Sequence, residues 1–343
     1  MDVPSARPQT VGHAAVTAEE RSLLARDRRL RSRAARASVS VAAVLVLAKV
    51  VASLLTGSVA LLASLVDSLS DLAASGLTLL SVRHASRPPD ADHRFGHGKA
   101  EALSSLVQAA LIAGSAFFVV HEAWTSLRDS EPVTQTAVGV AVMALAIVLT
   151  AGLVLYQRHV VRETGSVAIE GDSAHYRTDL LSAIAVIGAL ALERWTGLVW
   201  IDPAVGVVIA VYLALTAWSI GANAIDELMD RELPDDDRAR IERTVLEIDD
   251  VRGMHDLRTR SAGGHTFIEL HLELDPEMRL RQSHKIAERV SKRLHDEFPG
   301  CEVSLHQDPV GVDERRLDDV VARTESGEPL APLEAPEGPP GPP

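Results

Sequence analysis

Four ionisable residues stand in two pairs inside apolar stretches of this sequence, Asp67 with Asp71 and His175 with Asp179. The i, i+4 spacing of each pair places both side chains on one face of a helix, one turn apart. Two such helices facing each other would offer four ligands to one point, which is the number that tetrahedral zinc takes. Three carboxylates and one imidazole make a harder donor set than a His/Cys site, so Fe2+, Mn2+ and Cd2+ are alternatives to zinc.

These four groups would be costly in a membrane without an ion. An Asp at the bilayer centre costs about 2.5–3.5 kcal/mol on insertion scales, and four such groups together cost on the order of 10 kcal/mol. A divalent cation would offset that cost, whereas the alternative of structural buried hydrogen bonds leaves it unexplained. Because metal ligands must be deprotonated, protons and metal compete for such a site, and alternating exposure would exchange one for the other. His175 is the expected proton carrier, since an unperturbed imidazole titrates near neutral pH.

Six stretches of the sequence are apolar and long enough to cross a hydrocarbon core of ~30 Å at ~1.5 Å per residue. They are Ser38–Leu55, Gly57–Val82, Leu103–Val120, Val138–Tyr156, residues 168–192 and Ala204–Ala222. The fifth is the least apolar, because charged residues crowd its first half. We predict an α-helical polytopic membrane protein with six transmembrane helices over residues 35–228, preceded by a disordered basic segment over residues 1–34.

Lysine and arginine concentrate on one side of these spans. They are frequent in residues 21–36, 83–99 and 158–162, whereas the connections on the other side contain only Arg128 and Arg194. Because basic residues favour the cytoplasmic side of a membrane, both termini are predicted to be cytoplasmic.

Residues 229–310 have the pattern of a small soluble domain in the order helix, strand, strand, helix, strand. Three aspartates after Pro234 begin the first helix, and residues 266–274 alternate strictly between apolar and polar side chains, as a half-buried strand does. Residues 286–298 carry apolar side chains at every fourth position, which indicates a helix with one buried face. We expect an α+β domain, followed by a disordered acidic, Pro-rich tail over residues 311–343.

The overall composition excludes two classes of partner and ligand. The formal net charge of −13, concentrated in the soluble parts, argues against nucleic acid as a partner. Cys301 is the single cysteine, which excludes an internal disulfide and a thiolate cluster and fits a reducing cytosol. Metal ligands in this chain are therefore expected to be histidines and carboxylates.

Six motifs in the chain occur in the order typical of one family. They are D-S-L-S-D from Asp67, H-R-F-G-H-G-K-A-E from His93, the pair His175 and Asp179, D-R-E-L-P from Asp230, H-D-L-R-T-R from His255 and H-Q-D-P from His306. With these motifs the chain resembles the cation diffusion facilitators from about Arg28 to Pro309. The resemblance is closest to the bacterial ferrous-iron and zinc efflux branch.

This resemblance implies an antiporter, not an enzyme, that exports a divalent metal cation (zinc, iron, cadmium or manganese) from the cytoplasm in exchange for protons. It also implies a homodimer in the bacterial cytoplasmic (inner) membrane, with a cytosolic ferredoxin-like domain of αββαβ order. Two other classes stay open. A membrane-bound metal sensor would not need four buried ligands, and an intramembrane metalloprotease would need an H-E-x-x-H motif, which the sequence lacks.

The loop after the second span contains further candidate ligands. By resemblance, Asp90, His93 and His97 form a second, weaker metal site at the membrane surface; solvated loop residues are the alternative. Lys99 and Asp230 match an ion pair that ties the two domains together at the dimer interface. The alternative for Lys99 is that its side chain extends to the lipid headgroups.

The soluble domain contains six of the thirteen histidines. The resemblance implies a two-metal regulatory site there, in which an aspartate bridges the ions and metal draws the two protomers together. Its residues are His255, His271, His284, His306 and Asp308. Strand alternation places His271, His306 and Asp308 on exposed faces, so a merely solvated surface is the alternative interpretation.

Overall fold

The computed structural model describes residues 18–56, 59–126, 137–198, 200–311 and 316–326. The described residues form two compact units. The first comprises the chain up to Arg231 together with residues 261–265, and the second comprises residues 232–260 and those from Thr266 onward.

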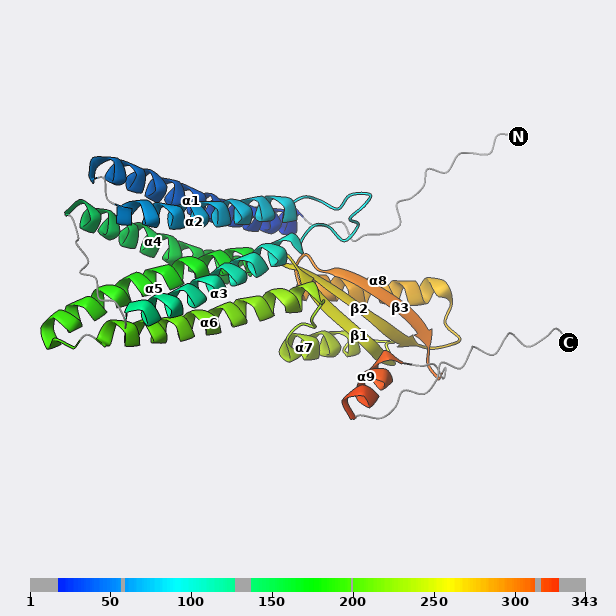
Figure 1. Ribbon diagram of the computed structural model, residues 1–343. Helices are drawn as coiled ribbons and strands as arrows, with labels where there is room; N and C mark the ends of the chain where they lie inside the picture. The colour runs from blue at the N-terminus through cyan, green and yellow to red at the C-terminus, as the bar shows by residue number, and fades with distance from the viewer. Residues whose placement is uncertain (1–17, 57–58, 127–136, 199, 312–315, 327–343) are drawn as a thin grey trace, which may run out of the picture. The chain divides into compact units, whose positions relative to one another are not determined.

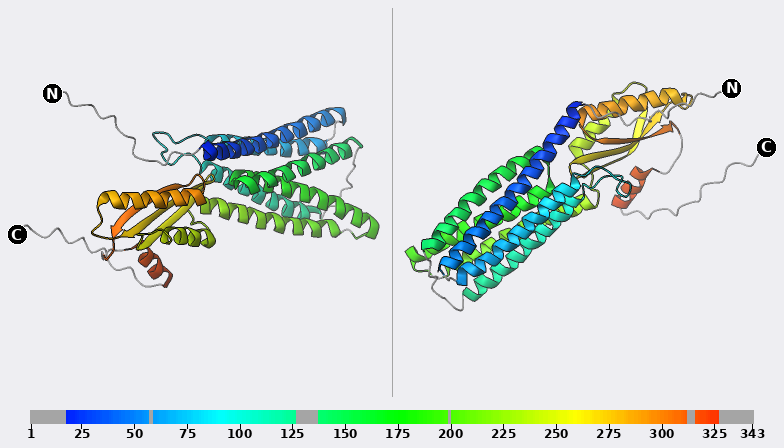
Figure 2. Two further views of the ribbon diagram at one scale, coloured as in Figure 1. Left: turned by 180° about the vertical axis from the view of Figure 1, so that it is seen from behind. Right: turned by 90° about the horizontal axis from the view of Figure 1, so that it is seen from above.

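Six long helices make up the first unit and run side by side (Figures 1 and 2). They are α1 (Ala18–Thr56), α2 (Val59–Ala85), α3 (Ala100–Ser126), α4 (Ala137–Thr164), α5 (Val167–Thr196) and α6 (Ile201–Leu228). Both ends of α5 are capped. The Ser166 hydroxyl accepts the Ile169 N–H at the N-terminus, and Gly197 adopts a φ of 72° at the C-terminus. The described part of every predicted span falls inside one of these helices.

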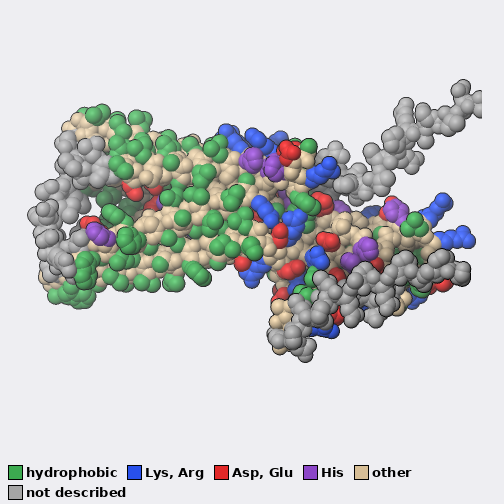
Figure 3. Space-filling view, turned by 45° about the vertical axis from the view of Figure 1, so that its right-hand side comes forward, with side chains coloured by type: hydrophobic (Ala, Val, Ile, Leu, Met, Phe, Trp, Pro, Cys, Tyr) green, Lys and Arg blue, Asp and Glu red, His purple; other side chains and the backbone are tan. Residues whose placement is uncertain are grey.

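Five of the described helices contain a stretch long and apolar enough to cross a membrane, namely Ala25–Leu55, Ser64–Ala85, Ala100–Trp124, Val140–Thr164 and Pro203–Leu228. The sixth helix, α5, is 30 residues long but carries charged residues in its first half. It packs against α3, α4 and α6, and Asp172 and His175 in its first half are buried. Figure 3 shows hydrophobic side chains spread over the outer surface of the helices. The predicted six-helix membrane architecture is therefore confirmed.

Small residues bring α5 close to α3. A Cβ atom on Gly171 of α5 would lie only 2.9 Å from the Ser105 Oγ and 3.2 Å from the Ser105 Cα. Ala109 of α3, Ala174 of α5 and Ala217 of α6 are buried together in one hydrophobic cluster. Membrane helices associate closely where their contact residues are small. This packing fixes the position of the ionisable residues on α5.

Residues 18–34 correct one prediction. They were expected to be disordered, but they form the first turns of α1, which is continuous from Ala18 to Thr56. The segment is rich in Ala, Leu and Arg and contains neither Gly nor Pro, so nothing in it interrupts a helix. The remainder of the predicted basic segment lies outside the described residues.

The second unit has the predicted αββαβ order followed by one more helix. Its elements are α7 (Asp235–Leu246), β1 (Gly253–Ala262), β2 (His265–Leu274), α8 (Leu280–Glu297), β3 (Glu302–Pro309) and α9 (Leu317–Ser326). The strands form one sheet in the order β1-β2-β3, and β2 pairs with β3 in parallel. This arrangement brings the middle residues of three strands side by side.

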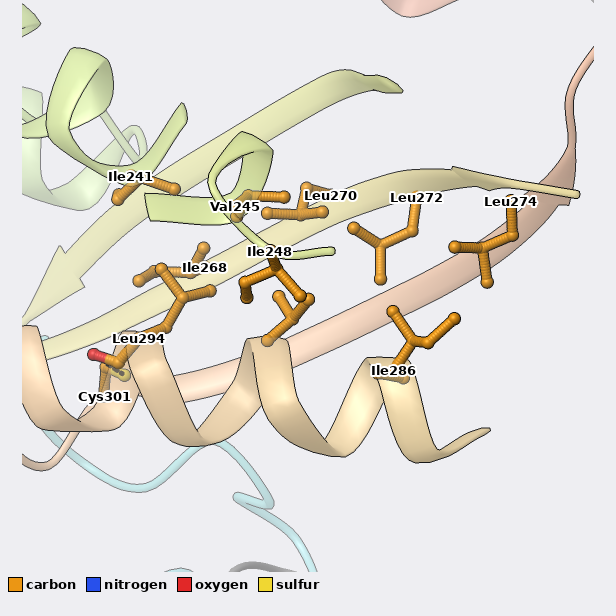
Figure 4. Packing of buried hydrophobic residues seen from close by; sticks show 12 residues of the cluster. Ile241, Val245, Ile248, Ile268, Leu270, Leu272, Leu274, Ile286, Leu294 and Cys301 are labelled. Atoms are coloured by element: carbon orange, nitrogen blue, oxygen red, sulfur yellow. Dashed lines mark hydrogen bonds between the residues drawn. The ribbon is translucent and has the colours of Figure 1, made fainter. Parts of the chain in front are cut away.

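The core of this unit lies between the sheet and two helices (Figure 4). Ile268, Leu270, Leu272 and Leu274 of β2 are at most 3% exposed, which confirms the predicted alternation. The facing side chains come from α7 and α8, namely Ile241, Val245, Ile286, Val290 and Leu294. The opposite face of the sheet is left for polar side chains.

Helix α9 corrects a second prediction, since the whole of residues 311–343 was expected to be disordered. The Asp256 N–H donates to the Asp318 carboxylate at 2.8 Å, and the Asp318 N–H donates to the Asp256 carboxylate at 3.0 Å. Burial alone would raise the pKa of Asp256, but the N–H groups of Leu317 and Asp318 hold that pKa below its usual value. The pairing is between residues far apart in sequence, so composition could not reveal it.

Candidate metal sites

Three of the four predicted intramembrane ligands come together between α2 and α5. The His175 Nε2 atom lies 3.0 Å from Asp71 Oδ1 and 3.6 Å from Asp179 Oδ2. Ligand atoms of all three residues lie within 4.8 Å of one another. His175 is nearly buried, at 6% exposed. One divalent ion could therefore contact all three side chains.

Asp67 does not join this cluster. It lies one turn before Asp71 on α2 and is exposed. The carboxylates of Asp67 and Asp71 repel each other. The i, i+4 spacing correctly predicted a shared helix face, but the fourth ligand position is not filled in this arrangement.

Lys49 of α1 contacts α2 beside this cluster. Its Nζ donates to the Ser64 carbonyl oxygen at 2.9 Å and to the Ser68 Oγ at 2.6 Å. Those two residues belong to the helical turn that carries Asp67. The lysine therefore places a positive charge near the carboxylates and holds the turn that presents one of them.

Asp172 of α5 is a buried acid that the sequence did not single out. It lies about one turn before His175 and has 0% exposure. Four donors surround its carboxylate, each from a different helix: Ser38, Ser75, Gln108 and Gln157. The carboxyl group is thus hydrogen-bonded by side chains instead of water, and the network ties α5 to α1, α2, α3 and α4 just beside the metal cluster.

The three predicted loop ligands also come together. Asp90 accepts the His93 N–H at 2.7 Å, and its carboxylate lies 3.2 Å from both His93 Nδ1 and His97 Nε2. The N–H of His93 is the main cause that lowers the pKa of Asp90, so the carboxylate is ionised at neutral pH. Gly96, with a φ of 82°, makes the turn that returns His97 to Asp90.

His84 is a fourth group beside this loop, and the sequence analysis missed it. Its ring lies 4.7 Å from the His97 ring, centroid to centroid, and the His93 ring lies 4.6 Å from His97. The His97 side chain is 4% exposed, and its buried Nδ1 atom has no hydrogen-bond partner among the described residues. His84 closes α2, nine residues before His93, so no helical spacing links it to the loop.

Four of the five predicted cytosolic ligands meet on the sheet. Register pairs His271 of β2 with His306 of β3. The Asp308 carboxylate lies 2.8 Å from His271 Nδ1, 3.1 Å from His306 Nε2 and 3.7 Å from His255 Nε2 of β1. A carboxylate surrounded by three imidazoles is suited to bridge two ions.

Two details differ from the prediction. Asp308 is 8% exposed instead of solvated, because imidazoles from three strands cover it. His284 lies apart from the cluster, is 60% exposed in its side chain and faces Glu288 at 3.5 Å. The structure adds Glu273, whose carboxylate lies 3.0 Å from His255 Nδ1 and 2.6 Å from Arg316 Nη2.

The predicted pair of Lys99 and Asp230 is present, with Nζ 3.0 Å from Oδ1. A second pair was not predicted and is buried: Arg31 Nη1 lies 3.1 Å from Glu101 Oε1, with side chains 10% and 1% exposed. Arg31 also donates to the Thr164 carbonyl oxygen at 2.7 Å. These charged contacts join α1, α3, α4 and the end of α6 at one end of the helical unit.

Comparison with known proteins covers nearly all of the described chain. A family profile described as "Cation efflux transmembrane domain" matches residues 35–229, and one described as "Cation efflux protein, cytoplasmic domain" matches residues 233–310. The cation-efflux pump FieF of Serratia proteamaculans is 45% identical over 284 residues, which is 83% of this chain and 94% of that protein. FieF of Shewanella oneidensis is 44% identical over 280 residues, 82% of this chain and 94% of that protein.

The structure of CzrB in its Zn form is 30% identical and covers 25% of this chain and 99% of that chain, with a TM-score of 0.24.

Proposed function

The chain belongs to the cation diffusion facilitator family of cation efflux proteins, and from that premise we propose that it exports a divalent metal ion from the cytoplasm in exchange for protons. It is a multi-pass membrane protein and a member of a family of cation transporters. The observation that carries the proposal is the convergence of Asp71, His175 and Asp179 between two helices of the bundle.

Zinc is the favoured cargo. The donor set of this cluster includes an imidazole, which suits zinc, beside carboxylates, which also accept Fe2+, Mn2+ or Cd2+. Three protein ligands leave a position for water or for Asp67, one turn away on α2. A cargo site must release its ion, so an incomplete ligand set is compatible with exchange whereas a closed structural site is not.

Protons are the proposed counter-ion, because the same atoms bind either species. With no metal bound, a proton on His175 Nε2 can be shared with the Asp71 carboxylate 3.0 Å away. Metal arriving from one side displaces that proton, and a proton arriving from the other side helps to release the metal. Alternating access then gives antiport.

The other clusters have supporting roles in this proposal. Asp90, His93 and His97 bind metal at the cytoplasmic surface, and the imidazoles around Asp308 bind regulatory metal that strengthens a homodimer. The histidines and carboxylates of both clusters fit zinc in their donor types. The pair of Lys99 and Asp230 holds the start of α3 against the end of α6.

The orientation proposed for this transporter has both termini in the cytoplasm of a bacterium, with the helices in the inner membrane. It rests on the basic residues of segments 21–36, 83–99 and 158–162. A membrane-bound sensor would need only the cluster around Asp308, so it leaves the intramembrane ligands without a role.

The proposal is tested by zinc uptake into sealed proteoliposomes. An acidic interior should drive uptake by outward proton movement, and a protonophore should abolish the effect of the gradient. Uptake that is indifferent to the pH gradient would indicate a channel, and absence of uptake together with tight zinc binding would indicate a sensor.

A further inference from the structure

We propose that His84 is a fourth ligand of the loop site, which makes it a closed zinc site with three imidazoles and one carboxylate. The inference rests on the proposed metal-binding role of Asp90, His93 and His97, but it does not depend on transport. It concerns a residue that lies outside the loop and outside the six matching motifs.

The position of His84 is fixed by the end of α2. Its carbonyl oxygen accepts the Arg87 N–H at 3.0 Å, so it lies where the helix gives way to the loop. The chain then returns, and His97 comes to lie against it with ring centroids 4.7 Å apart and planes at 80°. His97 is in turn 4.6 Å from the His93 ring.

The three loop ligands alone form an incomplete tetrahedral set. Asp90, His93 and His97 offer atoms within 4.8 Å of one another, which is three of the four ligands that structural zinc takes. The His97 ring is almost completely buried, and its Nδ1 lacks a hydrogen-bond partner among the described residues. A fourth protein ligand would complete the tetrahedral set that structural zinc takes, and His84 lies beside His97.

The side chain of His84 is free to complete the set. It is exposed, so it can change rotamer on the ps–ns timescale and turn a ring nitrogen toward the loop. Its backbone stays in place during that rotation, because α2 holds it. The alternative is that His84 only packs edge-on against His97, and the experiment below separates the two.

The donor types of these four residues also suit a zinc ion. Neutral imidazoles around one ionised carboxylate are the form that binds metal. A set dominated by imidazole favours zinc over Mn2+ or Mg2+.

A closed site has a consequence for function. Four protein ligands from α2 and the loop before α3 would hold zinc more tightly than three, with no position left for rapid exchange. The loop ion would then fasten α2 to α3 and would not be an ion in transit.

The test uses the full-length protein in nanodiscs with the other clusters removed by Asp71→Ala, His175→Ala, His271→Ala and His306→Ala. Zinc affinity is measured by competition with a chelator, and the number of imidazoles per zinc is counted by X-ray absorption. His84→Gln is compared with His159→Gln, which changes another exposed histidine near the cytoplasmic end of a helix. His93→Ala reports whether the loop binds zinc at all.

We expect three imidazoles per zinc in the parent and in His159→Gln, and two in His84→Gln. We expect His84→Gln to weaken zinc binding by at least ~10-fold, the lower end of the loss seen when a group that only supports a ligand is removed. Equal affinity and two imidazoles in all three proteins would overturn the inference. If every variant, His93→Ala included, keeps its zinc binding, the loop is not a metal site. Proton-coupled uptake by the unmodified protein would still support transport in that case.

Discussion

Replacing Asp308 with Asn should remove most of the stability that zinc confers on the second unit. The carboxylate lies within 3.7 Å of imidazoles from three strands, and the substitution keeps its size while removing its charge and one acceptor oxygen. A ligand that binds only the folded form adds about 2.7 kcal/mol of stability at a hundred times its Kd. For a domain of this size about 1 kcal/mol shifts Tm by about 4–8 °C, so one bound zinc should raise Tm by about 10–20 °C.

The assay is thermal unfolding of a fragment of residues 229–326, with zinc and with a chelator. The fragment keeps α9, because Asp318 and Asp256 exchange hydrogen bonds. Sedimentation measures whether zinc also tightens its dimer. Asp296→Asn removes the same charge from an exposed position and serves as the control. Full zinc stabilisation in Asp308→Asn, or none in the parent fragment, would show that the Asp308 carboxylate does not hold zinc in this unit.

Three further predictions concern the helical unit. Arg31→Ala leaves Glu101 buried without its ion-pair partner and should lower the free energy of unfolding by about 3–5 kcal/mol. Arg26→Ala breaks an exposed pair with Glu163 and should lower it by at most about 1 kcal/mol. Thermal unfolding in detergent measures both losses, and equal losses would show that burial of the pair does not matter. Zinc binding by the loop should weaken as pH falls, because metal ligands must be deprotonated, but its midpoint should not lie at the ordinary carboxyl value of about 4, because the His93 N–H lowers the pKa of the Asp90 carboxyl; a midpoint of about 4 in chelator competition would contradict this prediction. His175→Asp should shift transport from zinc toward Mn2+, because carboxylate ligands suit manganese, and an unchanged preference in competition flux would argue against His175 as a ligand.

Local patterns predicted most of the fold. Sequence spacing determines which face of a helix or strand each side chain occupies. The alternation of residues 266–274 and the apolar runs of the spans could therefore be predicted. The αββαβ order followed from the same patterns. Helix α9 and the start of α1 were missed, because expected disorder was inferred from composition, which does not reveal contacts such as that of Asp256 with Asp318.

In the candidate sites too, contacts between different elements could not be predicted from sequence spacing. The helical spacing of His175 and Asp179 predicted a shared ligand face, but no spacing relates His84 to His97 or Asp172 to its four donors on other helices. Burial of Asp308 was also missed, since alternation describes one strand and the covering imidazoles come from its neighbours. His284 was expected in the cytosolic site from the resemblance yet faces Glu288, because a resemblance in sequence does not determine where a side chain near the start of a helix points.

Metal is proposed to cross the membrane through the cluster of Asp71, His175 and Asp179. The most direct test is zinc flux into proteoliposomes by Asp179→Ala, with Glu193→Ala on the same helix as a control outside the cluster. We predict no flux above protein-free liposomes for Asp179→Ala, with unchanged elution as a folded protein, and parental flux for Glu193→Ala. Near-parental zinc flux by Asp179→Ala would show that metal does not cross the membrane through this cluster.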